Sequence, residues 1–259
     1  MNADRDIVWR IHHKAETVST NLDAREGLHG DVFTADYQTA GRGRLDHVWE
    51  SPRGQDLLMS VVLSVEGLAP EHVSTLPLVA GLAVCKSLFG MVGRSVPDRR
   101  GAQGTARPTV QLKWPNDVLV DGKKIAGILC ERNGDNVIAG IGVNVGQTEF
   151  DKGIAERATS LQIVCGAAGV RALPSSNTVR DQILSELGKW YGIWRSKGFA
   201  AVYPEIAAVD FLKGREIAVR QTDDDSAPIV GISNGIMPDG SLDVGGTKVY
   251  AGEAHVEKI

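Results

Sequence analysis

The chain has 259 residues, of which 42% are hydrophobic and 23% charged, and its formal net charge is −4. This composition supports an ordinary buried core, in one large domain or in a large domain with a small one. The acidic balance, without a basic cluster or tail, argues against a free-standing DNA-binding protein. Three widely spaced cysteines give neither a disulfide framework nor zinc-ligand spacing. The polar N-terminus does not resemble a secretion signal, and we expect no apolar run to reach the length of a membrane span. We therefore expect a soluble, cytoplasmic protein.

The first part of the chain alternates helical and strand-like patterns. In chain order we expect a helix over 15–29, strands over 32–37 and 57–65, a helix over 70–92, a Gly/Pro/Arg-rich loop over 93–108, two strands within 109–129, a strand over 137–145, and helices over 176–196 and 199–212. Asp121-Gly122 lies between two apolar runs, which predicts a tight hairpin turn.

After Gly214 the pattern changes to short strands separated by turn residues. We expect strands over 216–221, 229–234, 241–244 and 248–250, with a last stretch that reaches the C-terminus. The acidic run 223–225 is typical of a solvated hairpin tip rather than a metal site. Such a pattern predicts a small β-barrel, so we place a boundary near residue 212, between domains 1–211 and 212–259. Composition and pattern alone therefore indicate an α+β fold with a small β domain.

The segment Gly41-Arg42-Gly43-Arg44 follows a predicted strand. Its glycines let the backbone approach a ligand closely, and its guanidinium groups suit phosphate or carboxylate. It matches neither a dinucleotide-binding fingerprint nor a P-loop. Taken alone it is equally well explained as a solvated surface turn. The transition from an apolar strand to a Gly/Arg loop favours a flap that closes on ligand.

The segment Lys113-Trp114-Pro115-Asn116-Asp117 contains three turn residues, but a plain turn does not explain its lysine and tryptophan. Asp117 precedes Lys123 and Lys124 closely, and a hairpin would bring them together. A carboxylate near a lysine amine can orient it or accept its proton.

Lys123 and Lys124 flank the hairpin turn, where exposed charges are ordinary. Strand alternation places Lys124 and Ala126 on one face, and Lys123, Ile125 and Gly127 on the other. The pattern alone does not choose between the two lysines. Farther along, the segment 140–144 places two glycines and an asparagine on one face of a strand. It suits either close backbone packing or a smooth wall for a flat ring.

Four blocks in this order resemble the biotin–protein ligases, also called biotin–acetyl-CoA-carboxylase ligases. The blocks are Ser19-Thr20-Asn21; Tyr37 to Arg44 with Trp49; Lys113 to Asp117 with Lys123 to Leu129; and Gly140 to Asn144. The resemblance covers residues 7–259. It implies a class II synthetase-like catalytic core, made of a mixed sheet with flanking helices, and a small C-terminal SH3-like β-barrel.

The resemblance also implies a two-step reaction. The carboxylate of biotin attacks the α-phosphorus of ATP to give biotinyl-5′-AMP, and a lysine of a biotin carboxyl carrier domain then attacks this mixed anhydride. Mg²⁺ is expected to arrive with ATP, without a metal site of the protein's own. Since no covalent enzyme intermediate is needed, catalysis would depend on positioning and charge neutralisation.

The roles that the resemblance implies fall into three groups. The catalytic group is Lys124, Arg42, Arg44 and Asp117. The biotin-binding group is Ser19, Thr20, Asn21, Gln38, Gly41, Arg42, Gly43, Arg44, Lys124, Gly140 and Gly142. The nucleotide-binding group is Arg42, Arg44, Trp49, Asn116, Lys124 and Asn144.

Two departures from the family pattern stand out. Leu45-Asp46-His47 replaces further small or basic residues after the loop, and Asp46 adds a negative charge there. Few residues precede Ile7, so we expect no N-terminal helix-turn-helix domain. With the acidic balance, this predicts no specific DNA binding. We also expect a monomer or weak homodimer. Two alternatives remain, which are a lipoate–protein ligase and a non-enzymatic biotin-responsive regulator.

Overall fold

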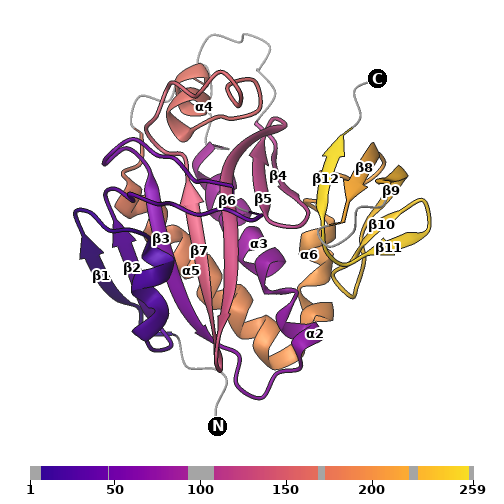
Figure 1. Ribbon diagram of the computed structural model, residues 1–259, viewed down its shortest axis with the longest axis horizontal. Coiled ribbons are helices and arrows are strands. Elements are labelled where there is room, and N and C mark those ends of the chain that lie inside the picture. Colours follow the sequence, from indigo (N-terminus) through magenta and orange to yellow (C-terminus); the bar gives the residue numbers. More distant parts are fainter. Residues whose placement is uncertain (1–6, 46, 93–107, 169–172, 222–226, 257–259) are drawn as a thin grey trace, which may run out of the picture.

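The computed structural model describes residues 7–45, 47–92, 108–168, 173–221 and 227–256. These residues form a mixed seven-stranded sheet with helices packed against it, and a second, five-stranded antiparallel sheet (Figure 1). The expected combination of a mixed sheet with flanking helices and a second, smaller sheet is thereby confirmed. The predicted loop over 93–108 lies almost entirely outside the described residues, as do Asp46 and the acidic run 223–225.

The seven-stranded sheet is built from segments that are far apart in the chain. Its strands are β1 (Arg10–Lys14), β2 (Asp31–Ala35), β3 (Leu57–Ser64), β4 (Val110–Lys113), β5 (Asp117–Val120), β6 (Lys123–Asn133) and β7 (Asn136–Val143). Their order across the sheet is β1-β2-β3-β7-β6-β5-β4. β1 pairs with β2 in parallel, and the other described pairs are antiparallel. β3 lies inside the sheet and is buried over almost its whole length, which explains its apolar run.

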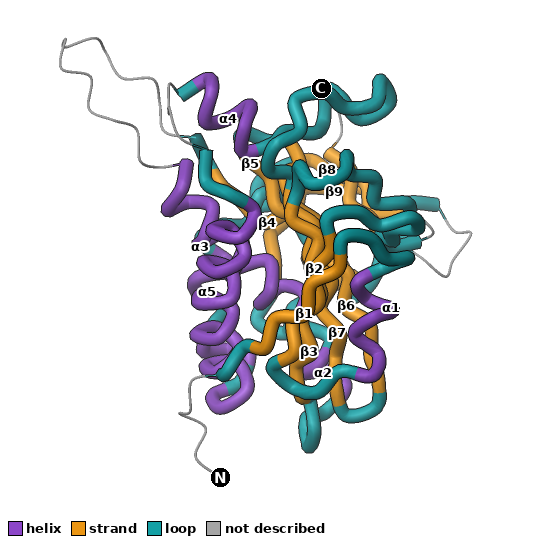
Figure 2. Tube along the Cα trace, turned by 90° about the vertical axis from the view of Figure 1, so that its left-hand side faces the viewer, coloured by secondary structure: helices purple, strands orange, loops and turns teal. Residues whose placement is uncertain are grey.

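The helices lie mainly on one face of this sheet. They are α1 (Thr20–Asp23), α2 (Pro70–Val73), α3 (Leu76–Val92), α4 (Leu161–Ala167), α5 (Ser176–Lys197) and α6 (Tyr203–Ala207), with 3₁₀ turns η1 (Ala24–Glu26) and η2 (Phe199–Ala201). Figure 2 shows α3 and α5 together on one side of the sheet and α1 on the other. The face opposite α3 and α5 therefore stays open for a site.

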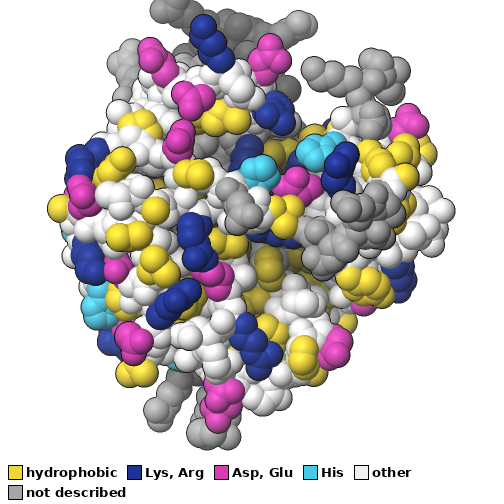
Figure 3. Space-filling view, viewed as in Figure 1, with side chains coloured by type: hydrophobic (Ala, Val, Ile, Leu, Met, Phe, Trp, Pro, Cys, Tyr) yellow, Lys and Arg dark blue, Asp and Glu magenta, His cyan; other side chains and the backbone are white. Residues whose placement is uncertain are grey.

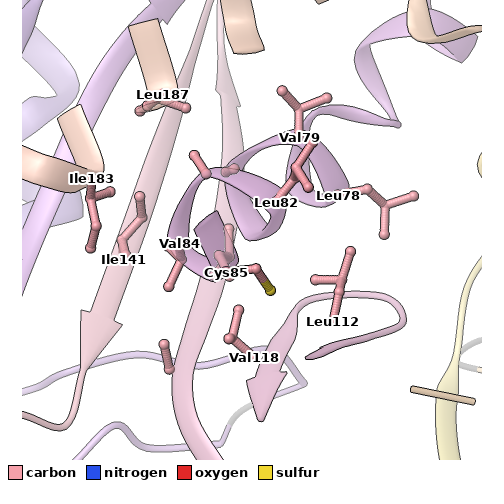
Figure 4. Packing of buried hydrophobic residues seen from close by; sticks show 14 of the residues in the cluster. Leu78, Val79, Leu82, Val84, Cys85, Leu112, Val118, Ile141, Ile183 and Leu187 are labelled. Atoms are coloured by element: carbon pink, nitrogen blue, oxygen red, sulfur yellow. The ribbon is translucent and has the colours of Figure 1, made fainter. Parts of the chain in front are cut away.

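α3 is sandwiched between the sheet and α5. Figure 4 shows its Leu82 and Cys85 among Leu112 of β4, Val118 of β5 and Ile183 of α5. Because neighbours surround it, α3 is apolar around nearly its whole circumference. The segment Pro70–Val92 is consequently long and apolar enough to cross a membrane, so the expectation that no run reaches this length is wrong. Within this segment, 72% of the apolar 18-residue stretch is buried inside the protein, as in a core helix.

Several predicted boundaries are wrong. The helix expected over 15–29 is confined to α1 and η1, because Ser19 before them and Gly27 after them are both extended. The helix expected over 199–212 is reduced to η2 and α6. β1 and α4 were not expected at all, since β1 is an exposed edge strand without alternation and α4 is short.

The region 109–129 holds three strands instead of two, because Trp114 to Asn116 form a second turn, between β4 and β5. The predicted hairpin turn is confirmed. Asp121 and Gly122 have φ values of 49° and 77°, the pair of positive values that a type I′ turn requires. Across this hairpin Lys124 of β6 pairs with Leu119 of β5, two residues after Asp117.

The C-terminal sheet follows α6. Its strands are β8 (Glu216–Arg220), β9 (Ile229–Ile236), β10 (Leu242–Val244), β11 (Thr247–Val249) and β12 (Glu253–Val256), in the order β11-β10-β9-β8-β12. Leu112 forms a parallel bridge with Asp210 in the connecting segment. The indole of Trp114, which is buried, donates a hydrogen bond of 3.1 Å to the carbonyl oxygen of Gly240. The tryptophan that a plain turn did not explain therefore attaches the C-terminal sheet to the core.

Candidate active site

A cavity of about 150 Å³ opens on the face of the seven-stranded sheet that α3 and α5 leave uncovered. It lies between α1, the Gly/Arg loop, the strands β3, β5, β6 and β7, and the start of β12. Most of the residues that the sequence predicted for the site line it: Ser19, Thr20, Asn21, Gln38, Arg42, Gly43, Arg44, Trp49, Asn116, Asp117, Lys124, Gly140 and Gly142. Gly41 and Asn144 do not line it. The fold thus brings four separate sequence blocks to one cavity.

Gly41 and Asn144 instead stabilise the loop and the strand beside the cavity. A Cβ on Gly41 would overlap the carbonyl oxygen of Trp49, so glycine allows the two arms of the loop to pair. The buried amide of Asn144 donates to the carbonyl oxygen of Thr159 at 2.9 Å. The backbone N–H of Thr159 in turn donates to the carbonyl oxygen of Lys124. Asn144 therefore braces the strand that carries Lys124. Its expected place beside the nucleotide stays a prediction.

One end of the cavity is closed by neutral polar groups. The side-chain oxygen of Gln38 accepts hydrogen bonds from the backbone N–H and the hydroxyl of Thr20, at 2.7 and 3.0 Å. The hydroxyl of Ser60 lies 2.7 Å from the Thr20 hydroxyl and 2.6 Å from Oδ1 of Asn21. Both Thr20 and Asn21 are buried. These hydroxyl and amide groups supply donors and acceptors without net charge.

Glu131 extends this chain of hydrogen bonds to the Gly/Arg loop. Nδ2 of Asn21 donates to Oε2 of Glu131 at 2.6 Å, and the guanidinium of Arg42 forms an ion pair with Oε1 of the same carboxylate. Arg42 is thus held against the sheet by Glu131 of β6. A hydrogen-bonded path therefore runs from the polar end of the cavity to an arginine of the loop.

Three glycines form the floor of the cavity. Gly127 on β6 pairs with Gly142 on β7, and Gly140 lies two residues before Gly142 on the same face. A Cβ on Gly140 would overlap Oδ1 of Asn21, and a Cβ on Gly142 would lie 2.5 Å from the ring of Trp49. Larger residues here would displace the groups that now cover the glycines. Of the two sequence interpretations of this strand, the smooth wall therefore describes the structure.

The indole of Trp49 lies over this floor. Its Nε1 is buried and has no hydrogen-bond partner among the described residues. The ammonium group of Lys124 lies 5.7 Å from the centre of the ring. Because an unpaired buried donor is unfavourable, this N–H is suited to an acceptor that arrives with a ligand.

Lys124 forms an ion pair with Asp117, with Nζ 2.7 Å from Oδ1. Strand alternation had placed Lys124 and Gly127 on opposite faces, and this is wrong. The register between β5 and β6 shifts by one residue between Val118 and Leu119. The bulge places an extra residue, Ile125, in β6, so Lys124 and Gly127 both face the cavity. Lys123 remains exposed at the turn.

The C-terminal sheet completes the other side of the cavity. Arg44 donates to Oδ1 of Asn116 and to the carbonyl oxygen of Gly252, both at 3.3 Å. His47 lies 3.2 Å from the carboxylate of Glu253, which lines the cavity at the start of β12. Figure 3 shows basic, acidic and histidine side chains gathered at the hollow between the core and the C-terminal strands. The Gly/Arg loop is therefore bonded to both sheets.

Burial also lowers the pKa of two basic side chains near this side of the cavity. It lowers the pKa of Arg44, against the opposing effect of Glu253 and Asp117. It likewise lowers the pKa of Lys113, which lies near Asp117, Lys124 and Glu253. Arginine stays protonated despite such a shift. Arg42, Arg44 and Lys124 line the same cavity, and their positive charges suit a ligand with several negative charges.

The sequence patterns did not identify Ser60, Glu131 or Glu253. Ser60 is a lone polar residue in an apolar strand, which is a weak signal. Glu131 follows Gly127 by four residues, so strand alternation from that glycine would have placed it on the cavity face. Glu253 comes from the other sheet, and no local pattern marks it. Among the described residues no group of three or more His, Cys, Asp or Glu side chains is arranged to hold a metal ion.

Comparisons with known proteins agree on one family. Residues 10–147 match the model of the biotin/lipoate A/B protein ligase family. The chain is 34% identical to a biotin–[acetyl-CoA-carboxylase] ligase of Mycobacterium tuberculosis, over 96% of this chain and 89% of that protein. It is 33% identical to a bifunctional ligase/repressor of Bacillus spizizenii, over 76% of this chain, and spans 56% of that longer protein. Among solved structures it resembles the biotin protein ligase of Aquifex aeolicus in complex with biotin and ATP, with a TM-score of 0.77, 27% identity, and coverage of 96% and 99%.

Proposed function

Because the chain belongs to the biotin/lipoate A/B protein ligase family, we propose that it is an ATP-dependent biotin–protein ligase. It would join biotin to ATP as biotinyl-5′-AMP and pass the biotinyl group to one lysine of a biotin carboxyl carrier domain. The observation that carries this proposal is the polarity of the cavity. A neutral polar end formed by Thr20, Asn21 and Gln38 faces a cationic end formed by Arg44 and Lys124, across a floor of glycine.

This polarity fits biotin and ATP. The ureido ring of biotin is neutral and carries both donors and acceptors, as do the hydroxyl and amide groups at the polar end. The biotin carboxylate and the ATP phosphates are anionic and match the cationic end. The buried, unpaired Nε1 of Trp49 supports a contact of its indole with the nucleotide. The mycobacterial relative and the Aquifex structure, which are named for biotin ligation and for binding of biotin and ATP, support the same substrates.

In the first step a carboxylate oxygen of biotin attacks the α-phosphorus, and the bond from that phosphorus to pyrophosphate breaks. Negative charge builds up between the two reacting groups. Lys124 is held by Asp117 and by the braced strand before reaction, so its charge stabilises the transition state without reorganisation. Arg42 and Arg44 bind the anionic groups from the loop. Mg²⁺ would be bound mainly by the phosphates, since Asp117 is already paired with Lys124.

In the second step the amine of the acceptor lysine attacks the carbonyl carbon of the adenylate. An amide bond forms, the bond to AMP breaks, and the amine loses a proton. Asp117 is placed to orient the incoming amine or to accept this proton, since it lies at the cavity beside Lys124. The protein supplies position and charge, and no covalent intermediate with it is required.

The finer features of the fold belong to the same proposal. We propose that the core is of the class II synthetase type and that the C-terminal sheet is an SH3-like barrel, divided from the core near residue 212. The strand order β11-β10-β9-β8-β12 and the start of β8 at Glu216 support this division. Three further expectations stay predictions: that the protein is cytoplasmic, that it is a monomer or weak homodimer, and that it does not bind DNA.

A pyrophosphate-exchange assay tests the proposal. The protein should catalyse exchange of labelled pyrophosphate into ATP when biotin is present and much less when lipoate replaces it. Exchange with lipoate alone would point to the lipoate ligases of the same family. Binding of biotin without exchange would indicate a biotin-responsive regulator. Biotinylation of a purified carrier domain, with its acceptor lysine replaced by arginine as control, tests the second step.

A further inference from the structure

Glu131 contacts two residues of the cavity from a position just behind it. Alternate residues of β6 face the same side, so Glu131 follows Gly127 and Leu129 on the cavity face. Its two carboxylate oxygens are used separately. Oε2 accepts from the amide of Asn21 at 2.6 Å, and Oε1 pairs with Arg42. One side chain thus contacts both the neutral end of the cavity and the loop that carries the arginines.

The Asn21 contact fixes the orientation of an amide. Oδ1 of Asn21 lies 2.6 Å from the hydroxyl of Ser60, and Nδ2 donates to Glu131. With both ends bonded, the amide cannot rotate without losing a hydrogen bond. The asparagine is buried, and the absence of a side chain on Gly140 leaves the space for it. A glutamine at position 131 would still accept the Asn21 hydrogen bond.

The Arg42 contact is different because it depends on charge. The Arg42 side chain is 40% exposed, and that of Glu131 is 29% exposed. In the proposed function Arg42 binds an anionic group of the ligand, so it must leave Glu131 when that ligand arrives. The free energy of the ion pair therefore opposes binding of the anion. A neutral ligand of the same shape would leave the ion pair in place.

We infer that Glu131 is a positioning residue that retains Arg42 in the ligand-free protein and releases it only to a competing anion. The inference rests on the proposed function, because it takes biotin as the ligand. It makes the Gly/Arg loop selective for ligands that carry a negative charge. It also separates two effects of Glu131, an uncharged one through Asn21 and a charged one through Arg42.

Two ligands distinguish these effects. Biotin carries a carboxylate, whereas biotinol, its alcohol analogue, has the same ring and chain without the charge. Isothermal titration calorimetry would measure the dissociation constant of each ligand for the wild type and for Glu131→Gln. The glutamine keeps the Asn21 bond and removes the counter-ion of Arg42. We expect biotin to bind roughly three- to tenfold more tightly relative to biotinol in the variant than in the wild type.

Two further variants test the assignment to Arg42. In Arg42→Gln/Glu131→Gln the gain should vanish, so that the ratio of the two constants lies within about twofold of that for Arg42→Gln alone. Glu131→Asp keeps the charge, and its ratio should stay within about twofold of the wild type. Glu216→Gln, which changes an exposed strand glutamate of β8, is the matched control and should leave both constants unchanged.

The outcomes separate the inference from the proposed function. An equal loss of affinity for biotin and biotinol in Glu131→Gln would show a purely structural role and overturn the inference. A ratio that does not change, or one that shifts equally in Glu131→Asp, would also overturn it. If the wild type binds neither ligand, the proposed function fails and the inference fails with it. Thermal denaturation of each variant confirms that the protein is folded. If the glutamine variant does not fold, Glu131→Ala replaces it: it also removes the counter-ion of Arg42, and its lost Asn21 hydrogen bond affects biotin and biotinol alike, so the same shift of the ratio is expected and an unchanged ratio would overturn the inference.

Discussion

The ammonium group of Lys124 lies 2.7 Å from the carboxylate of Asp117, although six residues and a hairpin turn separate them in the chain. The β-bulge at Ile125 turns Lys124 toward the cavity, and the segment braced by Asn144 holds its backbone. The charge of Lys124 is therefore in place before any substrate binds. This arrangement gives the first prediction.

Lys124→Ala should lower biotin-dependent pyrophosphate exchange by about a hundredfold or more, because it removes a preorganised charge from the transition state. Lys123→Ala is the matched control, since Lys123 is exposed at the turn and does not line the cavity. It should keep exchange within about twofold of the wild type. Near-normal exchange by Lys124→Ala would transfer the role to Lys123 or Lys113.

Arg44→Gly should release the adenylate faster than the wild type does. Arg44 joins the loop to Asn116 and to Gly252, so it keeps the loop over the cavity. Loss of a charge-assisted hydrogen bond of roughly 1.5–3 kcal/mol corresponds to about a tenfold to hundredfold faster release. Filter-binding measurements of labelled adenylate give this rate, and biotinylation of a bystander protein reports the escaped intermediate. Equal bystander labelling by the variant and the wild type would contradict the prediction.

Gly140→Ala should weaken biotin binding by about tenfold, because the new methyl group overlaps Oδ1 of Asn21 and displaces its amide. Calorimetry with biotin measures the change. Gly192→Ala on α5 is the control, since nothing lies within 4 Å of a Cβ at that position. It should bind biotin normally and, as a helix-interior glycine replaced by alanine, gain roughly 0.5–1 kcal/mol of stability. Normal biotin affinity in Gly140→Ala would show that Asn21 does not contact the ligand.

Asp31→Asn should remove part of the acid sensitivity of the fold. Burial alone would raise the pKa of Asp31, but hydrogen bonds from Leu28, His12 and Arg10 outweigh it and lower the pKa to about 2. A lowered carboxyl pKa contributes stability that is present above the unfolded value near 3.8 and is lost as pH falls toward 2. Urea unfolding should therefore show that the free energy of unfolding falls more between pH 6 and pH 2.5 in the wild type than in Asp31→Asn, by at most about 2 kcal/mol. Equal losses in the two proteins would exclude this role.

Residues 41–54 should be cleaved by trypsin more readily without ligand than with biotinyl-adenylate bound. The segment offers arginines at positions 42, 44 and 53. Its contacts with Glu131 and Glu253 are partly exposed, so we expect them to open more often until a bound anion adds further contacts. Mass spectrometry of timed digests locates the cuts. Cleavage that is equally fast with and without the adenylate would show that this segment does not close on ligand.

Much of the site could be predicted from local sequence. Turn chemistry at Asp121-Gly122 fixed a hairpin, and that hairpin alone brings Lys124 near Asp117. The glycines of β7 could be placed on one face because the strand period is two residues. The resemblance to a known family then assigned Ser19, Thr20 and Gln38 to the same site as the hairpin and the glycines of β7. No local pattern would have shown this.

Other features depended on long-range packing. The bulge at Ile125 reversed the face expected for Gly127, and only pairing with β5 reveals it. Asn144 matches a family block, yet its amide is directed to Thr159, and no spacing along the chain shows that. β1 was not predicted, because its exposed residues show no alternation of polar and apolar side chains. It is a strand because it pairs with β2.

The sequence by itself determined the chemistry available to this protein, because residue type sets charge, hydrogen-bonding capacity and backbone freedom. It placed two arginines, two lysines and three glycines within short segments whose local geometry follows from turn and strand rules. Tertiary structure alone decided which of the groups far apart in the chain meet. The contacts of Glu131 with Asn21 and Arg42, and of Arg44 with Gly252, join residues between 89 and 208 positions apart. Such contacts arise from the order of strands in two sheets, which burial of the whole core selects and no local pattern encodes.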